Sequence, residues 1–380
     1  MPLVRMFNRK KRKGNSLLRT IDAVMFVLTL SGALALAMSY FAPRTNPNDA
    51  WVFAFFGLGA PLLYFANLAL LLYWMFRWKP VFLLPAVVLL CGWGNISTFY
   101  RLPFGKSYGE TEQRGTITVL SFNTEGFVRR EGEESFSTAE EIVRWVVEQD
   151  PDIICFQEYQ STPKNPREKI DTLLAAWPHS RIANFLHQNG RGVLGVALYS
   201  KFPILASGEI EFLRSNNGTL YADLLTGRND TLRVINNHLQ TTKIDRSNLA
   251  FFDYDNFAQE PDKEGKIRQI AGRLRDGYRL RADQADSIAS LIRSRQVPTI
   301  VVGDFNDTPV SYTYRTIRGG YADSFEEKGS GYHYTYKNLF RMLRIDYILH
   351  SSGLETVAYD SPEVPWSDHN PVVATFIRKK

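Results

Sequence analysis

The chain has 380 residues, 22% charged and 44% hydrophobic, which is ordinary for a globular protein and enough for two or three structural units. Its formal net charge is +6, but the first twenty residues hold seven Lys or Arg and no acid, so the remainder carries 38 basic and 39 acidic residues. This balance argues against a globally positive surface that binds nucleic acid. Cys91 and Cys155 stand in separate apolar runs, which argues against a disulfide framework or a thiolate metal site.

Three long apolar runs occupy the first hundred residues, at 21–42, 51–76 and 81–100. Each reaches the roughly 20 residues that a helix needs to cross the hydrocarbon of a bilayer. We therefore predict three transmembrane α-helices in a membrane domain of residues 21–100. The alternative is a signal peptide followed by a buried helical hairpin, but a secretory signal is usually followed by a soluble chain rather than by two more apolar runs.

The distribution of cations predicts the orientation of this membrane domain. Residues 1–20 form a basic tip that is expected to stay in the cytoplasm, and Arg77 and Lys79, between the second and third runs, suit the same side. Three crossings then place a linker at 101–114 and all later residues outside. The sequence thus predicts a multi-pass protein of the cell (inner) membrane with an extracytoplasmic domain, periplasmic where the host has two membranes.

From about residue 116 the pattern changes to short apolar runs bounded by polar residues, which is typical of strands. Two amphipathic helices are predicted, at 137–149, with a capping-box spacing at its start, and at 278–295. Between them, residues 243–277 have mixed polarity and indicate an inserted loop or short helices. The predicted strands are 117–123, 152–158, 193–200, 219–225, 231–238, 298–306, 344–350 and 371–377.

Polar side chains of the types that bind metals or act in catalysis lie at or near the ends of several of these strands. Each of them alone has an ordinary explanation, such as a turn residue, a surface acid or a hydrogen-bonded histidine. Together they indicate a site, because strand ends on one edge of a sheet converge. The residues are Asn123, Glu158, His238, Asp304, Asn306, Asp346, Asp368 and His369.

The motifs that contain these residues resemble those of the endonuclease/exonuclease/phosphatase superfamily, which includes deoxyribonuclease, AP endonucleases and neutral sphingomyelinases. The resemblance covers residues 115–380 and implies an α+β fold with two packed mixed β-sheets flanked by helices, a four-layer sandwich. The combination of GDFN with a later SDHNPV is the most specific part. The motifs are LSFN (120–123), FQE (156–158), NNHLQ (236–240), GDFND (303–307), RIDYIL (344–349) and SDHNPV (367–372).

The resemblance implies hydrolysis of a phosphate ester that depends on Mg²⁺ or Mn²⁺. These cations prefer hard oxygen ligands and keep several waters, so one or two carboxylates suffice. Glu158 is expected to be the principal metal ligand, with Asn123 beside it and Asp368 in or near the coordination shell. The metal would neutralise negative charge in the transition state.

The remaining polar residues are expected to act on water and phosphate. Asp304 is the candidate to orient and deprotonate the attacking water, and Asn306 would donate hydrogen bonds to the phosphate or to that water. His369 would contact a phosphate oxygen as imidazolium, with Asp346 fixing its ring and raising its pKa. His238 would be a second donor on the phosphate side.

The substrate is left open between a lipid head group and a nucleic acid, since this fold hosts many substrates. The stretch FQEYQ lacks the lysine of AP endonucleases, and no WCDRIL-type motif of inositol polyphosphate 5-phosphatases is present. We hypothesise a membrane-anchored phosphodiesterase or phosphomonoesterase. The alternatives are a surface endo- or exonuclease of the same fold and a catalytically inactive, membrane-anchored binding module. The bilayer is the expected partner, and nothing in the sequence indicates a protein partner.

Overall fold

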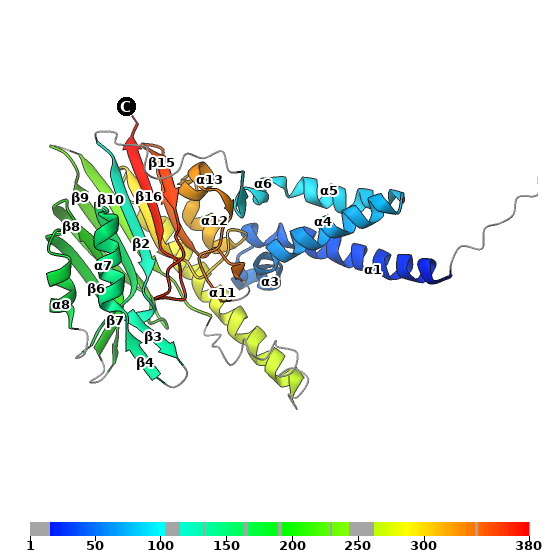
Figure 1. The fold of residues 1–380 in the computed structure, drawn as a ribbon, viewed down its shortest axis with the longest axis horizontal. Coiled ribbons are helices and arrows are strands. Elements are labelled where there is room, and N and C mark those ends of the chain that lie inside the picture. The colour runs from blue at the N-terminus through cyan, green and yellow to red at the C-terminus, as the bar shows by residue number, and fades with distance from the viewer. Residues whose placement is uncertain are drawn as a thin grey trace, which may run out of the picture.

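Two six-stranded sheets packed face to face form the centre of the larger part of the molecule (Figure 1). The computed structural model describes residues 16–102, 115–131, 134–162, 166–188, 192–228, 230–242, 262–338 and 341–379. The first sheet has the order β12 (Ala322–Asp323), β14 (Asp346–His350), β11 (Thr299–Asp304), β10 (Thr231–His238), β9 (Gly218–Leu225) and β8 (Ile204–Glu211). The second has the order β15 (Leu354–Asp360), β16 (Val372–Arg378), β2 (Ile117–Asn123), β5 (Ile153–Ser161), β7 (Gly192–Ser200) and β6 (His179–Gln188).

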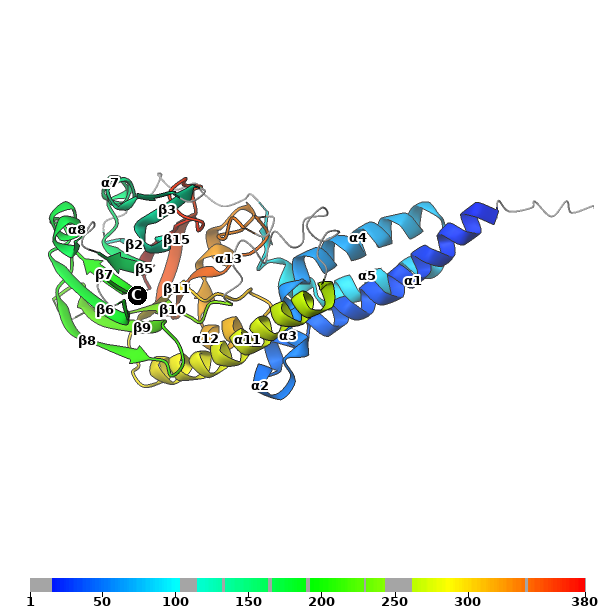
Figure 2. The same ribbon diagram turned by 90° about the horizontal axis from the view of Figure 1, so that it is seen from below.

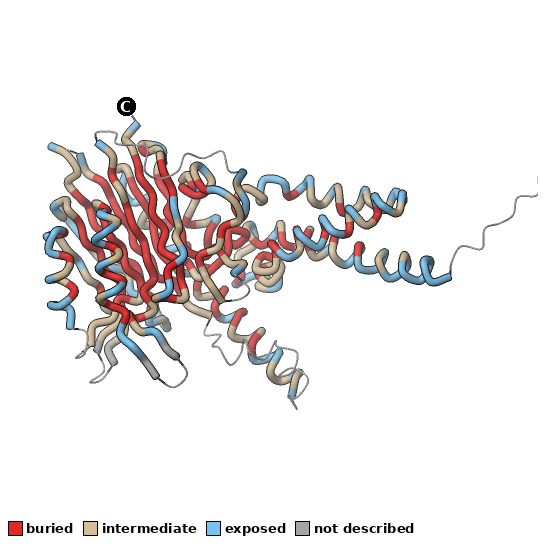
Figure 3. Tube along the Cα trace, viewed as in Figure 1, coloured by how far each residue is buried: buried red, intermediate tan, exposed pale blue. Residues whose placement is uncertain are grey.

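Both sheets are mixed, because β10 and β11 run parallel in the first and β2 and β5 run parallel in the second, whereas the other pairs are antiparallel. Their facing surfaces bury alternate apolar side chains, such as Val119 and Leu198 from one sheet and Val234 and Val302 from the other. Figure 3 shows this core as buried segments along the central strands. Cys155 lies in this core as a small buried residue and is not in a disulfide.

Helices cover the outer face of each sheet. Residues of α7 (Ala139–Gln149) and α8 (Arg167–Leu173) pack on the second sheet, and residues of α11 (Lys263–Arg293) and α12 (Tyr312–Arg318) pack on the first. The predicted α+β fold of two mixed sheets flanked by helices is therefore confirmed. The remaining short elements are η3 (Glu125–Phe127), the pair β3 (Val128–Glu131) and β4 (Glu134–Ser137), α13 (Ser324–Lys328), and the pair β1 (Tyr100–Arg101) and β13 (Gly331–Tyr332).

The structure corrects two local predictions about helices. Residues from Lys263 onward are part of α11, so the later part of the 243–277 stretch is helical, while residues 243–261 lie outside the described residues. In this half of α11, Ile270 and Leu274 are buried beside Ala54 of α3 (Val52–Leu58) at helical spacing, but glycines and charged residues around them weaken the sequence signal for a helix. The capping box predicted at 137–140 does not form, because Thr138 is the N-cap and makes no capping bond with its side chain.

A bundle of helices projects from one end of the two sheets (Figure 2). Polar contacts join its long members: Trp74 Nε1 donates to Thr29 Oγ1 over 2.7 Å, and Arg77 pairs with Asp22 at 2.7 Å. The helices are α1 (Ser16–Ser39), η1 (Ala42–Arg44), α2 (Pro47–Ala50), α3 (Val52–Leu58), α4 (Ala60–Phe76), η2 (Pro80–Phe82), α5 (Leu83–Cys91) and α6 (Trp93–Ile96).

The prediction of three transmembrane helices is not confirmed. Within the described residues, one helical stretch, Ser16–Arg44, is long and apolar enough to cross a membrane by itself. The second predicted run is broken into Val52–Leu58 and Ala60–Phe76 with a bend of 66°, so it counts as a span only if the two parts are taken together. The third run contains only the shorter apolar helix Pro80–Cys91, since the chain breaks again at Gly92. The basic tip up to residue 15 and residues 103–114 of the predicted linker lie outside the described residues.

Hydrogen bonds connect the bundle directly to the sheet-containing part, in addition to the covalent connection of the chain. Thr308 Oγ1 donates to the carbonyl of Gly57 over 3.3 Å, and Arg344 Nε donates to the carbonyl of Thr98 over 3.1 Å. Pairing of β1 with β13 adds backbone contacts beside them. These contacts fix which end of the sheets faces the bundle.

Candidate active site

Three neighbouring strands of the first sheet place polar side chains in one row at the sheet's end. The register pairs His238 of β10 with Asp304 of β11, and Asp304 with Asp346 of β14. His238 Nε2 lies 3.8 Å from Asp304 Oδ2. Asp304 and Asp346 are buried, so two carboxylates and an imidazole share a region with little access to water.

The turn after Asp304 is built from local backbone chemistry. Gly303 has φ of +123°, and a Cβ there would lie 2.0 Å from the carbonyl oxygen of Asn237, so only glycine fits this close strand contact. Asp304 Oδ1 then accepts the backbone N–H of Asn306 over 2.7 Å, and Asn306 adopts φ of +52°, which asparagine tolerates better than most residues. Asn306 Nδ2 donates to Asp304 Oδ2 over 3.0 Å. The GDFN motif thus fixes the Asp304 carboxylate.

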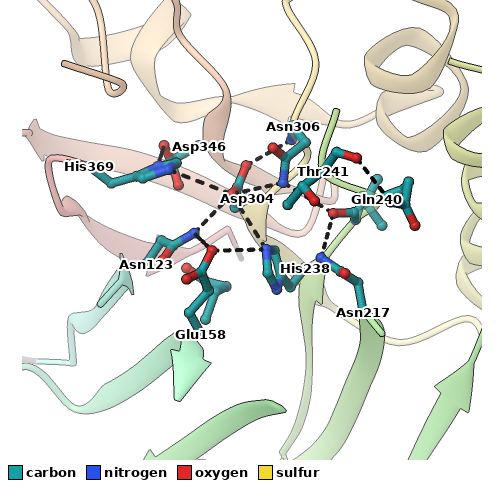
Figure 4. Close-up of polar contacts among 12 residues, drawn as sticks. Asn123, Glu158, Asn217, His238, Gln240, Thr241, Asp304, Asn306, Asp346 and His369 are labelled. Carbon is teal, nitrogen blue, oxygen red and sulfur yellow. Dashed lines mark hydrogen bonds and ion pairs between the residues drawn. The ribbon is translucent and has the colours of Figure 1, made fainter. Parts of the chain in front are cut away.

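The second sheet contributes Asn123 from the end of β2 and Glu158 from within the parallel strand β5, which continues to Ser161. The pairing of β5 with β7 shifts register between Phe156 and Tyr159, and Glu158 has φ of +50°, so a bulge directs its side chain out of the ladder. Asn123 Nδ2 donates to Asp304 Oδ2 over 3.0 Å and lies 3.4 Å from Glu158 Oε1 (Figure 4). Asn123 therefore connects the two sheets at the site.

The loop before β16 completes the cluster. His369 Nδ1 lies 2.9 Å from Asp346 Oδ2, and its Nε2 lies 3.9 Å from both Asp304 Oδ2 and Asp368 Oδ1. Ser367 Oγ donates to the carbonyl of Asn123 over 2.7 Å, which ties this loop to the end of β2. All eight residues singled out from the sequence thus lie in one connected group.

Buried amides join the two sheets directly beneath the group. Gln157 Nε2 donates to Asn236 Oδ1 over 2.6 Å, and Asn236 Nδ2 donates to the carbonyls of Phe156 and Ala197, each over 3.0 Å. Because a buried amide that loses a partner is costly, these bonds fix one sheet relative to the other. Asn236, the first asparagine of the NNHLQ motif, therefore has a structural role: it holds the two sheets together below the site.

The electrostatics follow from burial and crowding of like charges. Burial and the nearby charge of Asp346 raise the pKa of Asp304 to about 7, and burial and the charge of Asp368 raise the pKa of Glu158. Burial and proximity to His369 lower the pKa of His238 to about 3. Burial also opposes charge on His369, but Asp346 and Asp304 outweigh it and hold the pKa of His369 well above its ordinary value.

The group opens into a pocket of about 210 Å³, and sequence reasoning missed several residues around it. The ring of Tyr336 lies 5.1 Å from that of His369, between centroids. The backbone N–H of Asp368 donates to Glu125 Oε2 over 3.0 Å. Tyr336 is the last of three alternating tyrosines, at 332, 334 and 336, and nothing in that alternation marks one of them as a site residue. Leu58 of α3 also lines the pocket, although it belongs to the predicted membrane domain.

The residues present fit a divalent cation. One ligand atom each of Asp304, Asp346 and His369 lie within 4.8 Å of one another, and Glu158 and Asp368 bring two more carboxylates to the same pocket. Burial and neighbouring carboxylates raise the pKa values of Glu158 and Asp304, which means that their charged forms are disfavoured. A bound cation would stabilise those charged forms. Within the described part of the chain, His238 Nε2 is buried without a hydrogen-bond partner and faces this group.

Two different protein families match the sheet-containing part and the helical bundle of the chain. The sequence profile of the Endonuclease/Exonuclease/phosphatase family matches residues 120–369, and that of a domain of unknown function (DUF8431) matches residues 22–99. A search of curated proteins found no match.

Several solved structures are similar to the chain at low identity. An endonuclease/exonuclease/phosphatase from Beutenbergia cavernae DSM 12333 is 16% identical with a TM-score of 0.49, covering 70% of this chain and 72% of its own. The human Nocturnin catalytic domain with bound sulfate is 18% identical with a TM-score of 0.49, covering 71% and 97% respectively. An endonuclease/exonuclease/phosphatase from Bacteroides vulgatus is 16% identical with a TM-score of 0.47, covering 70% and 100%.

Proposed function

The chain belongs to the endonuclease/exonuclease/phosphatase family, and from this premise we propose that it hydrolyses a phosphate ester while anchored to a membrane. The observation that carries the proposal is the convergence of acids, amides and histidines from both sheets on one pocket. The family's activities of phosphodiester and phosphomonoester hydrolysis both suit this arrangement.

In the proposed reaction, Asp304 takes a proton from the attacking water. Its raised pKa, about 7, suits a general base near neutral pH, and the amides of Asn123 and Asn306 hold its carboxylate in place. The water oxygen forms a bond to phosphorus as the bond from phosphorus to the leaving oxygen breaks. The leaving oxygen takes up a proton from solvent, and the proton of the attacking water remains with Asp304 until it is released to solvent.

The histidines act on the phosphate in this proposal. His369, kept protonated by Asp346, donates from Nε2 to a phosphate oxygen and opposes the negative charge that builds up on it. His238 stays neutral, as its lowered pKa indicates, and its Nε2 supplies a second, uncharged donor. Neutrality at His238 avoids placing two cations next to each other in a buried site.

We assign the divalent cation, Mg²⁺ or Mn²⁺, to Glu158 with Asn123 and Asp368. Glu158 and Asp368 are the more exposed carboxylates of the group, with 27% and 24% of their side chains accessible, and they offer the hard oxygen atoms that these cations prefer. His369 is excluded as a ligand in this assignment, because an imidazolium has no free lone pair. When bound, the cation supplies a Lewis acid that neutralises charge on the phosphate.

We further propose that the helical bundle is the membrane anchor. Several large apolar side chains on α1 and α4 are more than half exposed, namely Leu17, Val27, Leu34, Leu62 and Phe65. Exposure of such side chains is unfavourable in water but favourable in the hydrocarbon of a bilayer. The α4 and α5 helices form a hairpin that leaves the sheets and returns to them (Figure 1). The sheets therefore lie on the side of the membrane opposite the basic tip whether only α1 or all three helices span it, and the tip is expected to remain in the cytoplasm.

The test is turnover of bis(4-nitrophenyl) phosphate by the full chain in detergent, with Mg²⁺ and with EDTA. We expect turnover that requires the cation and falls about 10²–10³-fold in Asp304→Asn. The matched control is Asp360→Asn, an exposed acid at the end of β15, which is expected to keep full activity. Equal rates in both variants, or no turnover by the parent chain, would favour an inactive binding module. Degradation of single-stranded or duplex DNA, measured in parallel, tests the nuclease alternative.

A further inference from the structure

The catalytic pocket has one apolar wall, and part of that wall comes from the helical bundle. Leu58 at the end of α3 lines the pocket together with Leu274 and Tyr278 of α11 and Leu343. Phe55, one turn before Leu58, packs edge-on against Tyr278 with ring centroids 5.7 Å apart. The pocket therefore lies at the end of the sheets that faces the bundle.

A second, larger cavity of about 590 Å³ lies within the bundle, between α4 and the α5–α6 segment. Every side chain that lines it is apolar or aromatic, including Leu68 and Leu71 of α4 and Leu89 and Leu90 of α5. We call this cavity the α4–α5 groove. Along α4 it extends from Pro61 to Leu71, and ten residues at 1.5 Å each give about 15 Å, half of the ~30 Å hydrocarbon thickness of a bilayer. The groove thus has the depth of one leaflet.

Within the described residues, the α4–α5 groove and the catalytic pocket have no lining residue in common, but residues close together in the chain line the two. Leu58 lines the pocket and Pro61, three residues later across the break between α3 and α4, lines the groove. At the same end of the groove, the hydroxyl of Tyr332 donates to the carbonyl of Met342 over 2.7 Å, and the next residue, Leu343, lines the pocket. The end of the groove nearest the sheets is therefore next to the apolar wall of the pocket.

We propose that the substrate is a lipid-linked phosphate ester whose hydrocarbon chain lies in the α4–α5 groove while its phosphate lies in the catalytic pocket. The inference rests on the proposed phosphoesterase function and names its substrate class. An apolar groove of one-leaflet depth suits an alkyl chain, because each buried CH₂ contributes about 0.8 kcal/mol to binding. A nucleic acid has no part that would fill such a groove.

The experiment compares ethyl 4-nitrophenyl phosphate with hexadecyl 4-nitrophenyl phosphate, two diesters with the same leaving group. The full chain in mixed detergent micelles is assayed at a fixed mole fraction of ester. We expect kcat/KM for the hexadecyl ester to exceed that for the ethyl ester by at least about tenfold. Ala86→Trp, which places a large ring in the groove, is expected to remove most of this ratio. Val87→Trp, on the exposed side of the same helix and outside the groove lining, is the matched control and should keep it.

The outcomes separate this inference from the proposed function. Hydrolysis of both esters with equal kcat/KM, or the same ratio in Ala86→Trp and Val87→Trp, overturns the lipid assignment and leaves a phosphoesterase. Hydrolysis of neither diester, nor of 4-nitrophenyl phosphate, a monoester assayed beside them, overturns the function itself. A change from dimer to monomer in Ala86→Trp with an unchanged ratio assigns the groove to a second copy of the chain. Leu71→Trp fills the groove from α4 and repeats the test where Ala86→Trp is not folded.

Discussion

At the scale of single residues, the contact between His369 and Asp346 governs which form of the imidazole is present. Asp346 lies 2.9 Å from Nδ1 of His369, and together with Asp304 it holds the pKa of His369 well above its ordinary value. Activity that needs the imidazolium is therefore present below that pKa and lost as pH rises through it. In Asp346→Asn we expect kcat/KM to fall about 10²-fold and the alkaline limb of the pH–rate profile to move to lower pH.

The pH–rate profile on bis(4-nitrophenyl) phosphate distinguishes this role from a merely structural one. Asp360→Asn serves again as the control and should retain the parent profile. A lower rate in Asp346→Asn with an unmoved alkaline limb would show that Asp346 does not act through the proton on His369.

The assignment of the cation to Glu158 gives a prediction that does not depend on turnover. A ligand that binds only the folded state stabilises it, by about 2.7 kcal/mol at a concentration 100 times its Kd. Mg²⁺ should raise the Tm of the full chain in detergent, and EDTA should reverse the increase. Glu158→Gln should lose most of this shift, whereas Glu168→Gln on exposed α8 should keep it. A full Mg²⁺ shift in Glu158→Gln would move the site to the Asp304, Asp346 and His369 cluster.

At the scale of elements, sequence periodicity predicts the strands that are buried on both faces and misses those that are not. The prediction 117–123 coincides with β2, and 231–238 coincides with β10, because both contain clustered β-branched and large apolar residues and are buried along almost their whole length. In contrast, β8 is largely exposed, and β6 begins and ends in polar residues, so neither carries a strong signal. The motifs identify the residues of the candidate site. They do not predict the bulge at Glu158 or the contact of Tyr336 with His369, because both depend on packing between segments far apart in the sequence.

The close approach of β11 to β10 predicts that Gly303 sets the position of Asp304. An alanine Cβ would meet the carbonyl of Asn237, and the φ of +123° is unfavourable for any side chain. We expect Gly303→Ala to lower the free energy of unfolding by about 2 kcal/mol or more and to reduce activity about 10²-fold through misplacement of Asp304. Thermal unfolding and kcat/KM measure the two effects. Gly320→Ala, where a Cβ meets nothing within 4 Å, is the control; a Gly303→Ala chain with parent activity would contradict the argument.

At the scale of the whole molecule, the bundle shows what hydropathy cannot predict. Composition alone indicated three runs of adequate length, but the break at Gly59 to Pro61 bends the second, and Gly92 interrupts the third. Those breaks turn α3 toward α11 and bring Leu58 to the pocket of the candidate active site. Apolarity marks residues that avoid water, whereas the distinction between lipid contact and contact with another part of the chain arises only in three dimensions.

Orientation in the membrane gives the last prediction. In spheroplasts of a Gram-negative host that express the full chain, alkaline carbonate should leave the protein in the membrane pellet, because exposed apolar helices such as α1 need hydrocarbon around them. External protease should digest the sheet-containing part, since the basic tip is retained in the cytoplasm. Replacing Arg9, Lys10, Lys11, Arg12 and Lys13 by Gln should give a mixture of orientations, seen as partial protection. Full protection of the parent chain until the cells are lysed would place the catalytic pocket in the cytoplasm and reverse the proposed topology.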